Sequence, residues 1–413
     1  MKIAFWGNQW AANLGNDCTL AAILDNVRQR IPEARLISIS MQPELMSERH
    51  KVEAVAAWGP VPGWIQAERG GRLLRILRRA ARQALAWGGT FRHASQFDAL
   101  IVPGTAILNH FDTPFSLPYH LFRWALITRL CGGKVFVLSI GVEDAAYPLT
   151  RLFVTSVLKL AARRSFRDRR SLELARRAGF RGAAEVLPDL AFSLPRPAQQ
   201  DPQSRGHGRT VAVGLLYYRF HYQAQSRGGG AAEAARLRYL DGIADLMIRL
   251  VGAGYVVKVI IGDTQDLQVA ADVEARLLAR GFDIKENPAY INGNDTQTTF
   301  VQLLEQLASV DFVIGSRFHN IVLGLFLCRP VLALSYEEKI EELMQEYGLG
   351  EFCRTLDEFQ VDDTMEMLQK LEARGGVLRG VIASRTQQHR QQLERQYDAI
   401  MTVLAEGGGR SLS

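Results

Sequence analysis

The sequence is poor in cysteine and has no long uninterrupted apolar run. Its four cysteines are far apart and form no Cys-x-x-Cys pair, at positions 18, 131, 328 and 353. This spacing argues against a zinc ribbon or a disulfide framework, and it favours a reducing compartment. The apolar run from Ile3 to Trp6 is too short for a signal peptide, and basic residues interrupt the longer stretches. We therefore expect a cytoplasmic protein that does not span a membrane.

Motifs of nucleotide and metal chemistry are also missing. The sequence has no Gly-x-x-x-x-Gly-Lys loop and no Asp-x-Asp pair in a loop after a predicted strand. It has no zinc finger, RRM-type aromatic motif or basic zipper, so we expect neither a bound metal nor a nucleic-acid partner. Glu338 and Glu346 have the spacing seen in some nucleotide-sugar glycosyltransferases, but a solvated acidic helix face explains them as well.

One segment has no acidic residue at all. Between Arg69 and Phe97 the chain has seven arginines and no Asp, Glu or Lys. The whole chain has a net charge of +6, so the residues outside this segment together carry a net charge of −1. Leucine, isoleucine and alanine recur there at helical spacing, which predicts an amphipathic helix. Two interpretations stay open. Residues 69–93 lie on an anionic membrane surface, or their leucines complete the core of the first domain.

What is present indicates a folded α/β protein. The chain has 413 residues, of which 47% are hydrophobic and 22% charged, enough for two or three domains. Short apolar runs alternate with helical patterns, which is typical of βα units around a parallel sheet. The pattern stops at a proline-rich linker and then starts again. We predict a first domain over 1–195, a linker over 196–209, a second domain over 210–375, and a C-terminal helix over 376–413 that packs back on the first domain.

The stretch from Asp311 to Asn320 is the sharpest chemical signal. An apolar strand ends there at a Gly-Ser turn that carries Arg317 and His319. A guanidinium and the N–H groups at a helix start together suit a phosphate or a carboxylate. Side chains two apart on a regular helix point away from each other, so the two residues can share a ligand only if this turn is not yet regular helix. Otherwise Arg317 binds backbone carbonyls and His319 is a packing residue.

Several motifs resemble the polysaccharide pyruvyl transferase family. They are Asp311 to Asn320, Pro330 to Lys339, Tyr347 to Leu349, Ser165 to Ser171 with its Arg-Asp pair, Leu187 to Phe192 with its Pro-Asp pair, and the Asn13-Leu14-Gly15 loop. The resemblance covers roughly residues 1 to 350. It implies two Rossmann-like domains of the GT-B kind with the site in the cleft between them. The implied reaction transfers the carboxyvinyl unit of phosphoenolpyruvate to two sugar hydroxyls, giving a pyruvate ketal and phosphate.

The resemblance also implies roles for individual residues. Catalytic roles fall to His319, as the proton donor, Arg317 and Asp168, with Asp189 as another possible base. Donor-binding roles fall to Arg167, Arg317, Ser316, Asn320 and Lys339. Helix capping by Asp168 and a structural turn at Asp189 are the alternatives. Phosphoenolpyruvate is a co-substrate in this scheme, and no further cofactor is expected.

Two loops depart from the family pattern and concern the acceptor. Asn16 follows Gly15 where many members have Asp, and Pro103-Gly-Thr-Ala106 replaces a glycine run. The acceptor-binding residues that we expect are Asn13, Gly15, Asp17, Gly104, Thr105 and Arg219. We expect a saccharide acceptor on a polyprenyl lipid, and hence a protein that is peripheral at the cytoplasmic membrane face. A GT-B glycosyltransferase with a nucleotide-sugar donor and a non-catalytic saccharide-binding relative remain alternatives.

Overall fold

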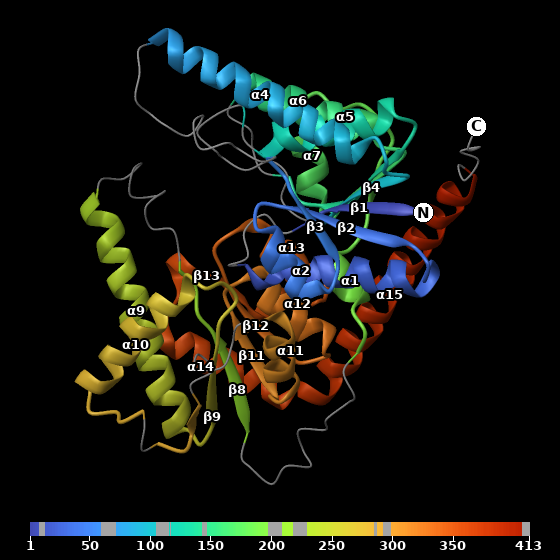
Figure 1. Ribbon diagram of the computed structural model, residues 1–413. Coiled ribbons are helices and arrows are strands. Elements are labelled where there is room, and N and C mark those ends of the chain that lie inside the picture. Colours follow the sequence, from blue (N-terminus) through green and yellow to red (C-terminus); the bar gives the residue numbers. More distant parts are fainter. Residues whose placement is uncertain are drawn as a thin grey trace. The chain divides into compact units, whose positions relative to one another are not determined.

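The chain forms two compact units in the computed structural model (Figure 1). The structure describes residues 1–7, 13–58, 72–104, 115, 117–142, 147–196, 209–217, 229–284, 287–291 and 299–406. The first unit comprises Met1–Ala11, Thr19–Leu194 and Arg390–Ser413, and the second comprises Ala12–Cys18 and Pro195–His389. Two helices, α1 (Leu14–Arg30) and α15 (Gly375–Glu406), therefore belong partly to each unit.

The first unit has a seven-stranded parallel sheet of order β3-β2-β1-β4-β5-β6-β7. Its strands are β1 (Lys2–Trp6), β2 (Arg35–Ser40), β3 (Glu53–Ala56), β4 (Ala99–Pro103), β5 (Lys134–Ile140), β6 (Arg163–Phe166) and β7 (Glu185–Val186). Its helices, besides the parts of α1 and α15, are α2 (Pro43–His50), α4 (Arg72–Ala94), α5 (Leu117–Leu130), α6 (Pro148–Leu160), α7 (Arg169–Arg177) and the 3-10 turn η1 (Leu190–Ser193). This strand order is that of a doubly wound, Rossmann-like sheet, in which ligands bind beyond the carboxyl ends of the strands.

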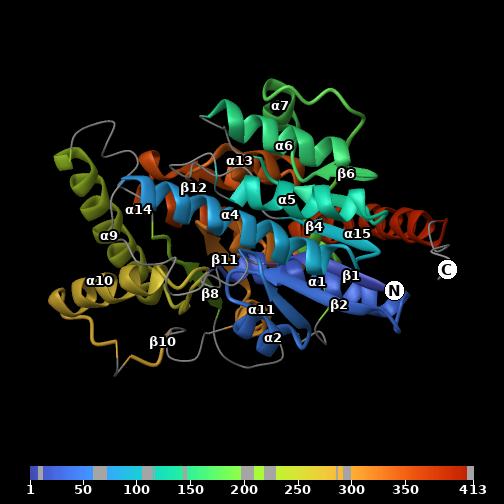
Figure 2. The ribbon, with the colours of Figure 1, turned by 45° about the horizontal axis from the view of Figure 1, so that its top comes forward.

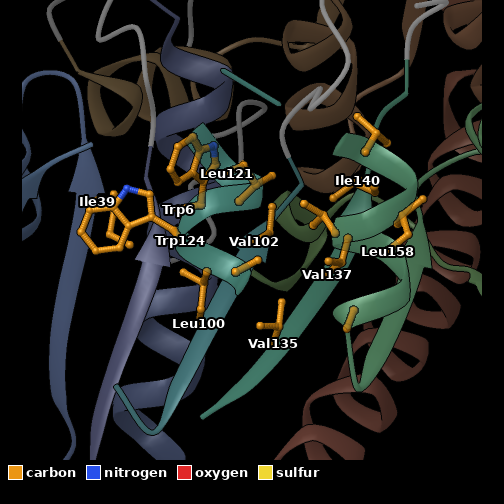
Figure 3. Packing of buried hydrophobic residues seen from close by; sticks show 14 of the residues in the cluster. Trp6, Ile39, Leu100, Val102, Leu121, Trp124, Val135, Val137, Ile140 and Leu158 are labelled. Carbon is orange, nitrogen blue, oxygen red and sulfur yellow. The ribbon is translucent and has the colours of Figure 1, made fainter. Parts of the chain in front are cut away.

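The core of the first unit lies between its sheet and helices α5 and α6 (Figure 3). Leu100 and Val102 of β4 and the corresponding valines of β5 alternate along their strands and meet Trp124 of α5. The Trp124 Nε1 donates a hydrogen bond to the carbonyl of Ala57, so this large ring is buried with its polar atom satisfied. The packing fixes the sheet edge at which the strand-end loops emerge.

The second unit repeats the same topology with six parallel strands in the order β10-β9-β8-β11-β12-β13. The strands are β8 (Thr210–Gly214), β9 (Val256–Ile260), β10 (Tyr290–Ile291), β11 (Phe312–Gly315), β12 (Val331–Ser335) and β13 (Cys353–Thr355). The helices are α9 (Gly229–Gly252), α10 (Asp266–Ala279), α11 (Phe300–Ala308), α12 (Phe318–Phe326), α13 (Glu338–Glu346) and α14 (Val361–Ala373), with 3-10 turns η3 (Gly350–Phe352) and η4 (Leu356–Glu358). The predicted α/β fold with two such domains is confirmed.

The last half of α15 packs within the first unit. Arg390 donates hydrogen bonds to the carbonyls of Phe192 and Leu194, at 2.9 and 2.8 Å, and the hydroxyls of Tyr397 and Ser193 are 2.8 Å apart. These contacts hold the helix against the end of η1. Within the described ranges, no helix combines the length and the hydropathy of a membrane-spanning segment.

Candidate functional site

The turn between β11 and α12 places Arg317 just before the regular helix. β11 ends at Gly315, Ser316 is fully buried, and Arg317 is the N-cap residue with an extended backbone, φ −83° and ψ 137°. The helix starts at Phe318, so Arg317 precedes the regular helix while His319 lies in its first turn. The extended backbone of Arg317 means that the two side chains are not two positions of one regular helix.

The Arg317 guanidinium is held by a buried carboxylate. Its Nε lies 2.5 Å from Oδ2 of Asp266 and its Nη2 lies 2.6 Å from Oδ1, which is a two-point ion pair. The Asp263 carboxylate is more distant, 3.9 Å from Nη1. Only 16% of the Arg317 side chain is exposed, and Asp266 is fully buried. Arg317 therefore has a fixed orientation, and its Nη1 edge is the part not bound to Asp266.

Asp266 is the centre of this cluster. Besides the two Arg317 contacts, its carboxylate accepts backbone N–H groups from Tyr217 at 2.6 Å, Asp263 at 3.0 Å and Gly262 at 3.3 Å. Burial raises the pKa of the Asp266 carboxyl, and the Arg317 guanidinium and the Tyr217 N–H oppose that rise. Burial lowers the pKa of Arg317, but the two carboxylates outweigh it and the pKa is raised. The guanidinium stays charged at every accessible pH.

The Asn320 side chain lies fully buried beside this ion pair. A Cβ on Gly214, the last residue of β8, would fall 2.7 Å from its Nδ2, and a Cβ on Gly262 would fall 2.8 Å from its Oδ1. Neither amide atom has a hydrogen-bond partner in the described part of the chain. A buried amide costs free energy unless its polar atoms are bound, so Asn320 fits a polar ligand at this sheet edge.

His319 lies half-buried against the N-terminal loop. A Cβ on Gly15 would fall 2.0 Å from the His319 Nδ1, so only glycine allows this approach of imidazole and backbone. The loop is tied to the same sheet edge, because the Leu14 N–H donates to the Gly262 carbonyl at 3.2 Å and Asn13 forms a β-bridge with Asp263. The structure therefore brings predicted acceptor residues and the predicted proton donor together within the second unit.

Other predicted residues lie at varying distances from this cluster. Asp17 is buried in the first turn of α1, within the second unit. The Lys339 Nζ forms an ion pair with Glu337 at 2.7 Å and lies 5.3 Å from the ring centre of Phe318, at the start of α12. Gly104 follows β4 in the first unit with φ +27°. Thr105 and Arg219 lie outside the described residues.

Arg167 forms a similar cluster in the first unit. It follows β6, and only 7% of its side chain is exposed. Its guanidinium lies against Gly141, where a Cβ would fall 2.6 Å from Nη2. Its Nε lies 3.4 Å from Asp168 and its Nη1 lies 3.9 Å from Asp189. The side chain is therefore fixed at the carboxyl end of the first sheet by backbone contact and two carboxylates.

Both aspartates of this cluster cap helices. Asp168 is the N-cap of α7 and accepts the Ser171 N–H at 2.6 Å, and Asp189 is the N-cap of η1 and accepts the Ala191 N–H at 2.9 Å. The capping interpretation of Asp168 is thus present in the structure, alongside its contact with Arg167. Gly179 follows the C-cap of α7 with φ +105°, a backbone conformation that favours glycine.

Sequence reasoning missed Asp263 and Asp266. A usable signal existed, because Gly262-Asp263 follows the apolar run from Tyr255 to Ile261, which forms β9, and so lies at the carboxyl edge of the second sheet. In the parts of the chain that the structure describes, no three His, Cys, Asp or Glu side chains gather in a manner that could hold a metal ion.

Two doubly wound parallel sheets with buried arginines at their carboxyl ends define a protein of the GT-B class. Solved structures of that class share the fold. A UDP-GlcNAc 2-epimerase of Methanocaldococcus jannaschii is 10% identical, covers 89% of this chain and 92% of its own, and has a TM-score of 0.54. The spinosyn forosaminyltransferase is 13% identical, covers 98% of this chain and 99% of its own, and has a TM-score of 0.52.

The family follows from the sequence. The model of the polysaccharide pyruvyl transferase family matches residues 13–338, and the chain belongs to that family. The matched range includes the N-terminal loop, the Arg167 motif and the Arg317 turn. No curated protein is significantly similar to the chain.

Proposed function

We propose that the protein transfers pyruvate from phosphoenolpyruvate to two hydroxyls of a saccharide and forms a cyclic ketal. Both hydroxyl oxygens bond to the enol carbon, and the bond from that carbon to the phosphate oxygen breaks. Of the two hydroxyl protons, one ends on the methylene carbon, which becomes a methyl group, and the other leaves with phosphate. Membership of the family supports the transferase class, and the donor is our inference.

The Arg317 turn is the observation that carries this proposal. A donor with a phosphate and a carboxylate needs fixed cationic hydrogen-bond donors, because burying its charges without them is prohibitive. Arg317 presents its Nη1 edge while Asp266 holds the opposite edge, and α12, whose first N–H groups favour an anion, begins at the next residue. Arg167 is our second donor-binding arginine. Its role rests on the resemblance of its motif to that of the family.

His319 is the proposed general acid. It follows Arg317 by two residues and lies against Gly15, so an enol bound to Arg317 has an imidazole close to the turn. Imidazole exchanges protons near neutral pH, which suits protonation of the methylene carbon. Asp168 and Asp189 remain the candidate bases. Each accepts a backbone N–H through Oδ1 and faces the Arg167 guanidinium with Oδ2.

We further propose that the acceptor is a lipid-linked precursor of a cell-surface polysaccharide. The family name specifies a polysaccharide, and the lipid linkage is our inference from the basic segment around α4. A polyprenyl-linked sugar is reached at the cytoplasmic membrane face, which makes a peripheral location the consistent one.

The test is incubation of the purified protein with phosphoenolpyruvate and a panel of lipid-linked oligosaccharides. We expect release of phosphate together with a product heavier by one carboxyethylidene group. The His319→Asn variant is the matched negative control, because it keeps a similar volume without the proton donor. A product heavier by a sugar, with nucleotide release from a nucleotide-sugar donor, would instead establish a glycosyltransferase. Acceptor binding without turnover on either donor would identify a saccharide-binding relative.

A further inference from the structure

Three neighbouring helices of the first unit form a layer without acidic residues. Helices α4, α5 and α6 together contain ten arginines and lysines, and none of them contains Asp or Glu. Figure 2 shows the three helices side by side, α5 between the other two. We call these three helices the basic layer. Its charge is more extensive than the arginine-rich segment visible in the sequence, because α5 and α6 continue it.

Polar and aromatic contacts join the helices of the basic layer. The fully buried Arg123 of α5 donates to the Thr90 hydroxyl of α4 at 2.8 Å. The Tyr119 hydroxyl donates to Gln83 of α4 at 2.7 Å, and its ring lies 5.3 Å from that of Phe153 of α6. The three helices therefore present their outer surfaces as one rigid face of the unit.

Large apolar side chains are exposed on this face. On α4, Ile76, Leu77 and Phe91 are 53%, 56% and 58% exposed, and Leu85 is exposed as well. Further exposed apolar residues lie at the beginnings of the neighbouring helices: Phe115, Tyr147, Leu149 and Leu152. The expectation that the leucines of α4 complete the core is wrong for Leu77 and Leu85. The described residues that α4 buries are Ala86, Thr90 and Ala94.

The apolar residues of α4 have the spacing of a continuous stripe. Leu77, Ala84 and Phe91 are seven residues apart, so they lie nearly in line along the helix, and all three are exposed. Arg92 is exposed and Arg78 half-buried, and both lie to one side of the stripe, whereas the exposed Arg75, Arg79 and Arg82 lie on the opposite side of the helix. An exposed apolar stripe flanked by cations, with no anion on the helix, is the arrangement of helices that bind at a bilayer surface.

We propose that the basic layer docks on an anionic lipid bilayer, with the stripe of α4 and the exposed residues of α6 inserted between headgroups and the arginines on lipid phosphates. Charge complementarity selects this occupant, because the exposed cations of the three helices, among them Arg79, Arg92, Arg129 and Arg151, have no acidic residue on those helices and attract an anionic partner. The exposed leucine, isoleucine and phenylalanine side chains favour a bilayer over a nucleic acid as the partner. A bilayer can bury them among acyl chains, whereas the phosphates of a nucleic acid offer no apolar surroundings. The docking does not depend on the proposed function, and only its biological purpose, access to a lipid-linked acceptor, rests on it.

The test is co-sedimentation of the full chain with vesicles of phosphatidylcholine alone or mixed with phosphatidylglycerol, at low and high salt. We expect binding to the anionic vesicles that weakens as salt rises. Changing Arg78 and Arg92 together to glutamine should lower the affinity about 30-fold and flatten its salt dependence. Changing Leu77 and Phe91 together to serine should lower the affinity roughly 10-fold and keep the salt dependence.

Matched controls lie elsewhere on the surface. Arg177, Arg385 and Arg395 are three exposed arginines outside the basic layer, and Leu278 and Val301 are exposed apolar residues of the second unit. Their glutamine and serine variants should bind vesicles as the unchanged protein does.

Failure of the unchanged protein to bind anionic vesicles at low salt overturns the proposal, as does an equal loss of binding in the control variants. If the protein does not bind vesicles but forms dimers, and the Leu77 and Phe91 substitutions dissociate those dimers, a second copy of the chain covers the face. The assay uses neither donor nor acceptor. It therefore succeeds or fails independently of the proposed reaction.

Discussion

Removing the Asp266 carboxylate should destabilise the protein strongly, which makes Asp266→Ala the sharpest test of the second-unit cluster. The substitution leaves the Arg317 guanidinium, with 16% of its side chain exposed, without its two-point partner. It also leaves three backbone N–H donors, those of Tyr217, Gly262 and Asp263, without their acceptor. Breaking a buried ion pair from one side typically costs about 3–5 kcal/mol.

That magnitude is a large part of an ordinary folding free energy of ~5–15 kcal/mol. For a unit of this size it corresponds to a fall in melting temperature of roughly 6–20 °C. Arg317→Ala should cost less, because Asp266 keeps its three backbone donors in that variant. The double variant should cost less than the sum of the two single changes by about 1–3 kcal/mol, since both remove the same interaction.

The chain contains suitable probes for this measurement. The four tryptophans that the structure describes, at positions 6, 58, 87 and 124, lie in the first unit, so their fluorescence reports that unit while circular dichroism reports both. Urea unfolding followed by both signals gives the free energy and shows whether the second unit unfolds first. Asp362→Ala is the matched control, because Asp362 pairs with Arg249 at the surface of the same unit, where a pair contributes only about 0–1 kcal/mol. Unchanged midpoints in both signals for Asp266→Ala would refute the assigned role of this carboxylate.

The remaining predictions concern catalysis and pH. His319→Ala should lower kcat by ~10² to 10⁴ with the fold intact by circular dichroism, and near-normal turnover would leave His319 a packing residue. Arg167→Lys and Arg317→Lys should each raise the KM for phosphoenolpyruvate and spare acceptor binding, and unchanged donor saturation would remove both from the donor site. EDTA should leave turnover unchanged, and a loss that Mg²⁺ or Mn²⁺ restores would favour a nucleotide-sugar donor. Burial, together with the nearby Arg123, lowers the pKa of His120 to about 3. Unfolding between pH ~6.5 and 3 therefore takes up a proton, and the free energy of unfolding falls as the pH drops through this range. Urea titrations of His120→Gln should show a weaker fall.

The sequence predicts the fold well because its pattern is local. Alternating apolar runs and amphipathic stretches mark each βα unit, and the apolar runs from Lys2 to Trp6 and from Tyr255 to Ile261 form β1 and β9 to within a residue at each end. The environment of α4 is less predictable. Helical spacing identifies its apolar side, but whether a leucine is buried depends on the contacts of the folded chain, and the described residues that α4 buries are Ala86, Thr90 and Ala94.

The N-terminal loop shows the same limit. The sequence predicts that Asn13 and Gly15 form a loop after the first strand. It does not show to which of the two units this loop belongs. The structure assigns Ala12–Cys18 to the second unit, where Gly15 contacts His319. A separation of about 300 residues lies between these partners, and no local pattern records a contact of that kind. The glycine at this position is explained only by the imidazole that lies against it.

Both candidate arginines share one arrangement that the sequence reveals only in part. Each is buried beside two aspartates of its own unit: Arg167 beside Asp168 and Asp189, and Arg317 beside Asp266 and Asp263. The Arg-Asp neighbours at 167 and 168 form a visible motif, whereas Asp266 is the first residue of α10, 51 residues before Arg317. With both aspartates ionised, neither cluster has a positive net charge. Recognition of an anionic donor therefore depends on the orientation of each guanidinium and not on the net charge of the cluster. One edge of the guanidinium must hold the carboxylate while another edge holds the donor. A lysine ammonium has no second edge, which is the physical reason to expect that Arg317→Lys fails despite its retained charge.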